Sequence, residues 1–281
     1  MCHACVMDEV KRRMLSRRDA LKGGAGAVAA GAVAATGLGA AARPRPARAE
    51  AHTGLGASPV DATHELHERF PTFFGEQQFF MDRKFGFEEN GFNLFELRVN
   101  EHTGTHVDAP LHFSADGDSV AEIPVESLVC PLVVVDIREK AAEDADAQVT
   151  PDDLKAWTEV NGEIPDGACV VMLSGWGEFV DTEKFRNVRG EGMHFPGFHP
   201  EAAQMLLDDT NAAGIAVDTL SLDHGPSADF ATHYAWLPAG RWGIECIANL
   251  ERLPAAGATL VVGAPKHRGG SGGPARVIAL V

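Results

Sequence analysis

The pattern of apolar and polar positions predicts strands spread along the whole chain beyond residue 60. Apolar runs rich in β-branched residues at 131–137 and 168–174 are typical of buried strands. Residues 93–99 alternate apolar and polar side chains with a period of two, which predicts a half-buried strand. Three further strand-like segments follow, at 214–223, 258–265 and 275–281.

Two segments carry the start signals of helices. Thr150 is followed by a proline and two acidic residues, which predicts an N-cap and a favourable first turn. Pro200 repeats the pattern and opens a helix that we expect to end at Gly214. The segments 69–90 and 185–198 are rich in Phe, Gly and charge and predict long surface loops, which often carry function. Together these elements predict one α/β domain with a mixed β-sheet and a few helices.

The N-terminal 49 residues differ in composition from the rest of the chain. A charged stretch precedes an apolar run at 23–42, and residues 47–49 (ARA) fit a small-residue cleavage site. Arg17 and Arg18 stand where a twin-arginine export signal carries its arginine pair. This arrangement predicts a signal peptide that directs the protein out of the cell.

The predicted organisation is a signal peptide over 1–49, a linker over 50–60 and one catalytic domain over 61–281. An uncleaved membrane anchor is the alternative for the first segment, because its apolar run is long enough to span a bilayer. After cleavage we expect no stable membrane partner, since no other segment is sufficiently apolar.

The charge of the chain argues against nucleic acid as a partner. The formal net charge is −16, and it becomes −22 without residues 1–49, which hold nine of the 24 basic and three of the 40 acidic residues. Such a surface repels phosphate backbones and anionic lipids. Only seven of the 24 basic residues are Lys, and an acidic, Lys-poor surface suits high salt. We therefore predict a halophilic source and a small-molecule substrate.

The three cysteines of the predicted domain do not suggest disulfide bonds. Cys130, Cys169 and Cys246 each lie in an apolar context, which is typical of small buried hydrophobic residues. Their odd number argues against a disulfide framework. None has an evident activating neighbour, and the chain lacks a G-x-S-x-G motif, so nucleophilic catalysis through Cys or Ser is disfavoured.

The stretch EHTGTHVDAPLHF, residues 101–113, contains several side chains that can bind a metal ion or transfer a proton. In an extended strand, alternate residues share a face, so His102, His106 and Asp108 point the same way, with Gly104 leaving an empty slot between them. In a helix Asp108 would face away from both histidines. We therefore expect a strand ended by a proline, with His112 in the turn beyond it.

Two imidazoles and one carboxylate suit a borderline divalent cation such as Zn²⁺ or Mn²⁺. A metal site needs at least one further ligand, and spacing alone leaves the choice open. His194 and His199 are also candidates for substrate contact. Acidic residues at strand ends, such as Asp218 and Asp223, more often accept backbone hydrogen bonds. The candidates for further ligands are His194, His199, His224, His233, Asp218, Asp223 and Glu245.

The segment HTGTHVDAPLH resembles the signature of the cyclase superfamily of metal-dependent hydrolases. That superfamily includes bacterial kynurenine formamidases, isatin hydrolases and dienelactone hydrolases. The likeness extends over 61–281 and takes in several weaker motifs in the family's order. These are VDATHEL, SGWGEF, AVDTLSLD, HYAWL, IECIANLERLP and LVVGAPKHRGGSGGPARVIAL.

The resemblance implies a β/β/α fold of the kynurenine formamidase type, and a site. It implies that one or two metal ions are held and that His112 is the general acid/base. It also implies a homo-oligomer, because members of the family commonly self-associate. The implied metal ligands are His102, His106, Asp108, His233 and Glu245.

The expected activity is hydrolysis of an amide by metal-activated water, in the manner of an arylformamidase acting on an N-formylkynurenine-type substrate. One departure bears on the substrate: Phe73 stands where formamidases usually carry a Trp that packs on the substrate ring. Hydrolysis of a cyclic amide or lactone, of the isatin or dienelactone type, is therefore the alternative. A metal-binding or ligand-binding protein without turnover is a second alternative, and it would not need His112.

Overall fold

The computed structural model describes residues 57–190 and 192–281. The predicted signal peptide at 1–49 and most of the predicted linker lie outside these residues, so export and cleavage stay predictions. Within the described ranges, no helix combines the length and the apolar character needed to cross a membrane.

The chain divides into two compact units, the smaller of which includes residues 81–97. Here strands β2 (Phe79–Phe85) and β3 (Leu94–Val99) pair with each other, and helix α2 (Phe87–Asn90) joins them. The predicted strand at 93–99 is confirmed, but the expectation that it is half-buried is wrong because all six β3 residues are exposed. The predicted loop at 69–90 is also wrong in part, since it contains β2 and α2. The alternation of apolar and polar residues predicts a strand, but it does not show whether other parts of the protein cover either face.

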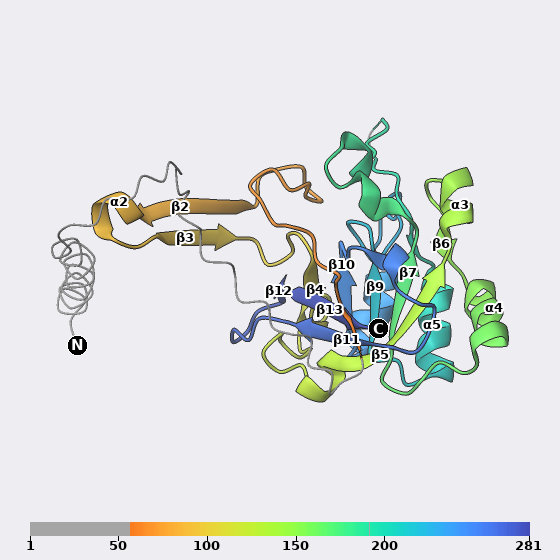
Figure 1. The fold of residues 1–281 in the computed structure, drawn as a ribbon. Helices are drawn as coiled ribbons and strands as arrows, with labels where there is room; N and C mark the ends of the chain where they lie inside the picture. The colour runs from red at the N-terminus through yellow and green to blue at the C-terminus, as the bar shows by residue number, and fades with distance from the viewer. Residues whose placement is uncertain (1–56, 191) are drawn as a thin grey trace, which may run out of the picture. The chain divides into compact units, whose positions relative to one another are not determined.

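The larger unit, whose described residues are 57–80, 98–190 and 192–281, is built on a nine-stranded mixed sheet (Figure 1). The four central strands are parallel, and all other pairings are antiparallel. This confirms the predicted α/β domain with a mixed sheet. In spatial order the strands are β1 (Pro59–Asp61), β13 (Arg276–Leu280), β11 (Ala258–Gly263), β5 (Val129–Asp136), β7 (Cys169–Leu173), β9 (Gly214–Val217), β10 (Trp242–Glu245), β4 (His106–Asp108) and β12 (Gly272–Pro274).

Two hydrophobic clusters cover the two faces of this sheet. One joins alternate residues of the parallel strands β5, β7 and β9 to helices α4 (Pro151–Asn161), α5 (Pro200–Asp209) and α6 (Ala231–Trp236). The other contains Val60 of β1 together with Val107 of β4, so the sheet curls around this cluster. The remaining elements are α3 (Arg138–Glu143), β6 (Gln148–Val149), β8 (Gly197–Phe198), and the 3₁₀ turns η1 (Pro110–His112), η2 (Val125–Leu128), η3 (Trp176–Phe179), η4 (Glu183–Phe185), η5 (Leu237–Ala239) and η6 (Leu250–Arg252).

Helix α5 ends earlier than predicted. It was expected to reach Gly214, but its last residue is Asp209. The Thr210 hydroxyl accepts a hydrogen bond from the Ala212 N–H at 3.2 Å, a local bond that competes with continuation of the helix. Gly214 instead begins β9, beside Trp242, whose ring leaves no room for a Cβ at that position.

The three cysteines are buried and free, as predicted. Burial raises the pKa of the Cys130 thiol to about 11 and those of Cys169 and Cys246 well above the usual value. A thiol that stays protonated is a poor nucleophile and a poor metal ligand. These side chains therefore act as core residues.

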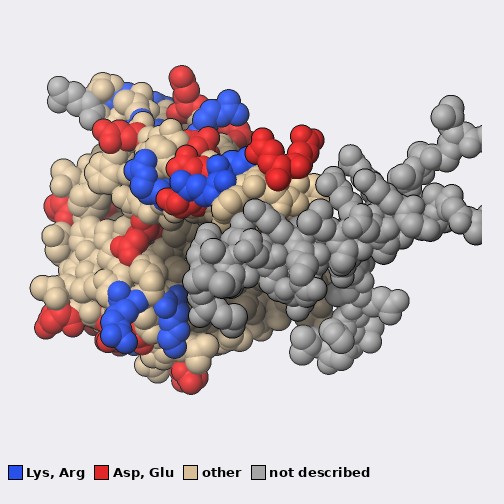
Figure 2. Space-filling view, turned by 90° about the vertical axis from the view of Figure 1, so that its left-hand side faces the viewer, with Lys and Arg blue, Asp and Glu red and all other residues tan. Residues whose placement is uncertain are grey.

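Acidic and basic side chains lie interspersed on the face that Figure 2 shows. Exposed pairs include Arg138 with Asp136 and Arg276 with Asp61, each at 2.6 Å. Pairs as exposed as these contribute about 1 kcal/mol or less to stability. The acidic excess of the sequence remains the dominant charge property, and the halophilic source stays a prediction.

The N-terminus of α4 gives a first prediction. Thr150 and Asp153 form the predicted cap as a capping box, in which the Thr150 N–H donates to the Asp153 carboxylate at 2.7 Å. Replacing Thr150→Ala should lower the free energy of unfolding by about 1 kcal/mol. Urea denaturation measures the change. Glu159→Ala, at an exposed position of the same helix, serves as the control and should change it by less than about 0.5 kcal/mol.

Candidate metal centre

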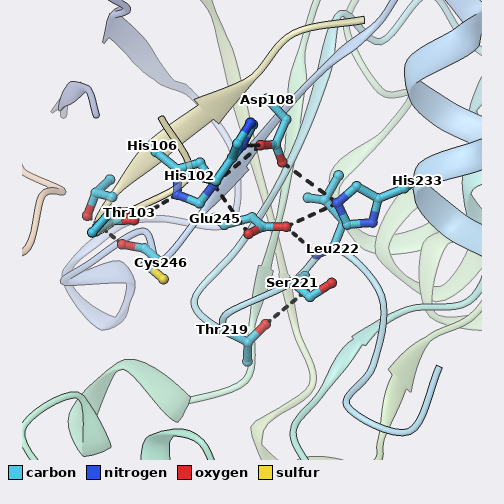
Figure 3. Close-up of polar contacts among 12 residues, drawn as sticks. His102, Thr103, His106, Asp108, Thr219, Ser221, Leu222, His233, Glu245 and Cys246 are labelled. Atoms are coloured by element: carbon cyan, nitrogen blue, oxygen red, sulfur yellow. Dashed lines mark hydrogen bonds and ion pairs between the residues drawn. The ribbon is translucent and has the colours of Figure 1, made fainter. Parts of the chain in front are cut away.

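Strands β4 and β10 place the central residues of the candidate site by their register. Glu245 lies directly opposite His106, and Gly243 lies opposite Asp108. Side chains two residues apart share a face of a strand, so His106, Glu245 and Asp108 point to the same side (Figure 3). A Cβ on Gly243 would lie 3.4 Å from Asp108 Oδ2 and 2.7 Å from Leu222. The glycine therefore keeps space beside the carboxylate.

His102 reaches the same place by a turn and not along a strand. The predicted strand is wrong before His106, because β4 covers only His106–Asp108 and residues 101–105 are bends. Gly104 has φ +72°, which favours glycine, and a Cβ there would meet the Leu66 side chain at 2.9 Å. The expectation that Gly104 leaves a slot beside the ion is therefore wrong. The turn brings His102 Nδ1 within 2.7 Å of Asp108 Oδ1.

The inward atoms of the five predicted ligands form two groups that share Asp108. His106 Nε2 lies 3.3 Å from Asp108 Oδ1 and 3.4 Å from Glu245 Oε2. His233, carried by α6, places its Nε2 3.2 Å from Glu245 Oε1 and 3.8 Å from Asp108 Oδ2. The first group is His102, His106 and Asp108, and the second is Asp108, His233 and Glu245.

Each of these three histidines has a partner for its outward nitrogen. His106 Nδ1 donates to the Gly104 carbonyl at 2.8 Å, and His233 Nδ1 donates to the Asp223 carboxylate at 2.6 Å. These bonds direct Nε2 of both rings inward, towards the carboxylates. Metal-binding histidines typically have such an outer partner, which fixes the ring and its tautomer.

The five residues fit a divalent metal ion. The two carboxylates are buried: Asp108 has 0% and Glu245 6% of its surface exposed. Among the described residues, His106 Nε2 and Asp108 Oδ2 are buried without a hydrogen-bond partner, and both face the shared centre. Two such atoms that face one shared space are suited to bind an ion there. Imidazole and carboxylate donors suit Zn²⁺ or Mn²⁺, and the two groups have room for one ion or two. The role of each residue as a ligand stays a prediction.

Without an ion, protons hold this centre together. Burial alone would lower the pKa of His106 and His233, but the facing carboxylates and Asp223 raise them to about 9 and about 10. Burial would raise the pKa of Asp108, yet His106 and His102 hold it well below its usual range. Both imidazoles therefore carry a positive charge at neutral pH in the metal-free protein.

His112 lies beside the centre but has the opposite electrostatic character. The 3₁₀ turn η1, which begins at Pro110, stacks its ring on His102 with centroids 3.8 Å apart. Burial is the main cause that lowers the pKa of His112 to about 4; Asp108 opposes this shift, and the neighbouring histidines add to it. His112 is therefore neutral at pH 7 and available to accept a proton.

A cavity of about 340 Å³ opens over these residues. Aromatic rings form its wall: Phe73 and Phe230 lie 5.8 Å apart, and Phe113 lies 5.6 Å from Phe230 and 4.6 Å from His233. None of the described residues that line this cavity is Lys or Arg. The lining residues are Pro71, Thr72, Phe73, Phe74, Gln78, Asn100, His102, Gly104, His106, His112, Phe113, Leu220, Ser221, Phe230, His233, Glu245 and Cys246.

The other sequence candidates lie outside both ligand groups. Asp218 accepts hydrogen bonds from backbone N–H groups, as expected for an acid at a strand end. Asp223 orients His233, a role that spacing did not reveal. His194 pairs with Asp146 at 2.8 Å, and His199 caps α5, so neither lines the cavity. A larger surface hollow of about 920 Å³ along residues 180–188 contains none of the predicted ligands.

Sequence reasoning also missed two aromatic residues of the cavity wall. Phe113 directly follows His112 in the stretch 101–113, and this adjacency could have indicated that Phe113 lies near the site. Phe230 adopts a left-handed backbone conformation at the start of α6, with φ +52°. Nothing in its neighbourhood in the sequence distinguishes it from a core phenylalanine.

Residues 60–224 match the Cyclase family, so the chain belongs to that family and the resemblance is confirmed. The chain is 34% identical over 192 residues to an isatin hydrolase of Roseibium aggregatum, covering 65% of this chain and 73% of that protein. It is 29% identical over 194 residues to a kynurenine formamidase of Salinibacter ruber, covering 68% and 81% of the two chains.

Solved structures show the same fold. Isatin hydrolase A from Labrenzia aggregata, bound to benzyl benzoate, gives a TM-score of 0.76 at 35% identity and covers 82% of this chain and 96% of that chain. Isatin hydrolase A from Ralstonia solanacearum gives a TM-score of 0.76 at 36% identity and covers 82% and 94%. The predicted kynurenine formamidase-like fold class is thus confirmed.

The protonation of the centre predicts how metal binding depends on pH. Imidazole binds metal in its neutral form, so an ion must displace the protons that His106 and His233 hold below pH 9 to 10. The apparent affinity for Mn²⁺ should therefore rise by about tenfold or more per pH unit near neutrality. Competition with a chelator, corrected for its own titration, measures the slope.

His112→Ala is the control for this prediction. His112 is already neutral near pH 7, since its pKa is about 4. Its removal should leave the slope of affinity against pH unchanged. An affinity that stays flat between pH 6 and 8 in the unmodified protein would contradict the assignment of His106 and His233 as ligands.

Proposed function

We propose that this protein is a metal-dependent hydrolase that cleaves the C–N bond of a small, neutral, aromatic cyclic amide of the isatin type. One observation carries the proposal. Buried, unpartnered ligand atoms converge at the base of a cavity with aromatic walls, and His112 lies beside them as a neutral base.

The metal would be held by His102, His106, Asp108, His233 and Glu245, and when bound it supplies Lewis acidity towards a carbonyl and towards water. The work of the protein itself falls to other groups. An imidazole nitrogen of His112 accepts the proton that the attacking water loses and returns it to the amide nitrogen as the C–N bond breaks. The aromatic wall holds an aryl ring and keeps bulk water away from the buried carboxylates.

The character of the cavity favours a neutral substrate. N-formylkynurenine carries an amino-acid tail with a carboxylate and an ammonium group. Among its described lining residues the cavity has no Lys or Arg to pair with that carboxylate. Its acidic member, Glu245, is committed to the ligand cluster. A fused aromatic lactam needs neither partner, and rings such as Phe73, Phe113 and Phe230 can pack on its face.

Arylformamidase activity is the second candidate. The likeness to the Salinibacter ruber kynurenine formamidase supports it, and the same residues can perform the same chemistry on an acyclic formamide. Phe73 provides an aromatic surface where formamidases usually carry Trp, but it lacks the indole N–H. The two candidates therefore differ in the substrate and not in the mechanism.

His112 gives the prediction that separates a hydrolase from a protein that only binds metal. His112→Ala should lower kcat by about 10² to 10⁴-fold, since a general base is lost, while Mn²⁺ affinity changes by less than about threefold. Steady-state kinetics and metal titration on the same preparation measure both. Retention of wild-type kcat would exclude His112 as the proton carrier. Metal binding without hydrolysis of any amide, lactam or lactone by the unmodified protein would favour the binding function.

A substrate panel tests the preference for neutral aromatic lactams. The kcat/KM for isatin should exceed that for N-formylkynurenine by about tenfold or more, because the charged tail of the latter lacks partners in the cavity. Phe73→Ala should raise KM for isatin more than it lowers kcat, since it removes ring contact rather than chemistry. A higher kcat/KM for N-formylkynurenine would instead establish the arylformamidase.

A further inference from the structure

The glycine-rich segment 269–274 (GGSGGP) lies against the metal centre, although it contains none of the predicted ligands. Its last three residues form β12, which pairs with β4 so that Gly272 lies opposite Asp108. The residue before β12, Ser271, accepts a hydrogen bond on its carbonyl from the Ala109 N–H at 2.9 Å. The backbone of Ser271 is therefore fixed at the edge of the ligand strand.

The side chain of Ser271 connects His102 to a carboxylate. His102 Nε2 lies 2.9 Å from Ser271 Oγ. Ser271 Oγ lies 2.6 Å from Glu101 Oε2, and the Ser271 N–H donates to the same oxygen at 3.2 Å. The other Glu101 oxygen lies 2.6 Å from His267 Nε2. A continuous chain of hydrogen bonds thus runs from His267 through Glu101 and Ser271 to His102.

The two glycines beside Ser271 provide the space for this chain. A Cβ on Gly272 would lie 2.7 Å from His102 Cε1 and 2.3 Å from the Val107 carbonyl. A Cβ on Gly270 would lie 2.1 Å from His267 Nε2 and 2.6 Å from Glu101 Oε1. Real Cβ contacts do not occur at these distances. Gly272 is therefore required, because the Val107 backbone cannot move aside, whereas a side chain at position 270 would displace the His267 and Glu101 groups from their present contact.

We propose that Ser271 and Glu101 are positioning residues that fix the ring and tautomer of His102 for metal binding. The proposal rests on the proposed metal site. His102 directs Nδ1 towards Asp108, so an ion held by this group would bind Nδ1, and the single ring proton would then lie on Nε2. Nε2–H then donates to Ser271 Oγ, whose hydroxyl donates to Glu101 Oε2. Each of these two donors has one acceptor, so both hydrogen bonds run in the same direction, from His102 towards Glu101.

This arrangement completes a pattern in the centre. Asp223 orients His233 directly and the Gly104 carbonyl orients His106, whereas His102 is oriented by a carboxylate acting through a serine. His102 is also the most exposed of the three, with 21% of its side chain accessible against 3% for the others. Packing restrains the His102 ring least, so the orientation of this ring depends more on its outer hydrogen bonds.

The chain offers a matched control that has the same serine–glutamate contact but touches no ligand. Ser119 Oγ and its N–H both donate to one Glu122 oxygen, at 2.6 and 2.9 Å. No hydrogen bond among the described residues links Ser119 to a histidine. Ser119→Ala therefore removes the same kind of bond without changing an imidazole.

The experiment titrates metal-free protein with Mn²⁺ by calorimetry in the wild type, Ser271→Ala, Glu101→Gln and Ser119→Ala. Ser271→Ala should weaken Mn²⁺ binding by about tenfold or more, and Glu101→Gln by a smaller factor because its amide oxygen still accepts a bond. Ser119→Ala should stay within about twofold of the wild type. At saturating Mn²⁺, kcat of the Ser271 and Glu101 variants should return to near the wild-type value, because these residues act through the ligand.

The outcomes are separable. Wild-type affinity in both Ser271→Ala and Glu101→Gln overturns the positioning role and leaves the proposed hydrolase intact. Equal weakening in Ser119→Ala also overturns it, because the effect then reflects general stability. If the wild type binds no Mn²⁺ or Zn²⁺, both the proposed function and this inference fail. Should Ser271→Ala fail to fold, the affinity of Glu101→Gln decides.

Discussion

Two buried carboxylates in contact with the same small space are the constraint on which this structure depends. Asp108 and Glu245 lie on neighbouring strands inside a domain that is already strongly acidic. Removing one carboxylate from water costs several kcal/mol even after the protein relaxes, and a second nearby adds repulsion. Positive charge at the centre offsets that cost, together with the Leu222 N–H that donates to Glu245 at 3.0 Å. The histidines, and the ion that they are arranged to hold, supply that charge.

The same constraint separates the four histidines of residues 101–113 and α6 into two kinds. His102, His106 and His233 each face a carboxylate and have an outer partner, which holds the ring with one nitrogen inward. His112 instead contacts imidazole and phenyl rings. Its pKa falls while those of His106 and His233 rise. A single residue type therefore provides both metal ligands and a base, according to what surrounds each ring.

The sequence predicted the central strands, the start of α4 and the five candidate ligands. Apolar runs predicted the central strands because both faces of those strands are buried, and local caps predicted the start of α4. The family motif and the spacing of His233 and Glu245 pointed to the five residues that the structure brings together. Helix α6, which carries His233, was not predicted because its six residues are too few to show a period.

What failed in the sequence reasoning depended on tertiary contacts. The expectation that alternate residues of a strand share a face placed His102 near Asp108 for a wrong reason. A left-handed turn at Gly104, and not an extended strand, brings the two together. The partners that orient the ligands are distant in sequence: Ser271 lies 169 residues from His102. Such pairs leave no periodic signal. Their polar residue types are also common in loops of every kind.

The buried thiols have a consequence for how the core responds to redox conditions. Cys130, Cys169 and Cys246 are free, enclosed and held in the protonated form by their surroundings. Within the described residues no covalent cross-link contributes to the fold. Because an enclosed, protonated thiol reacts slowly with oxidants, the core that the structure describes should stay chemically the same under reducing and oxidising conditions.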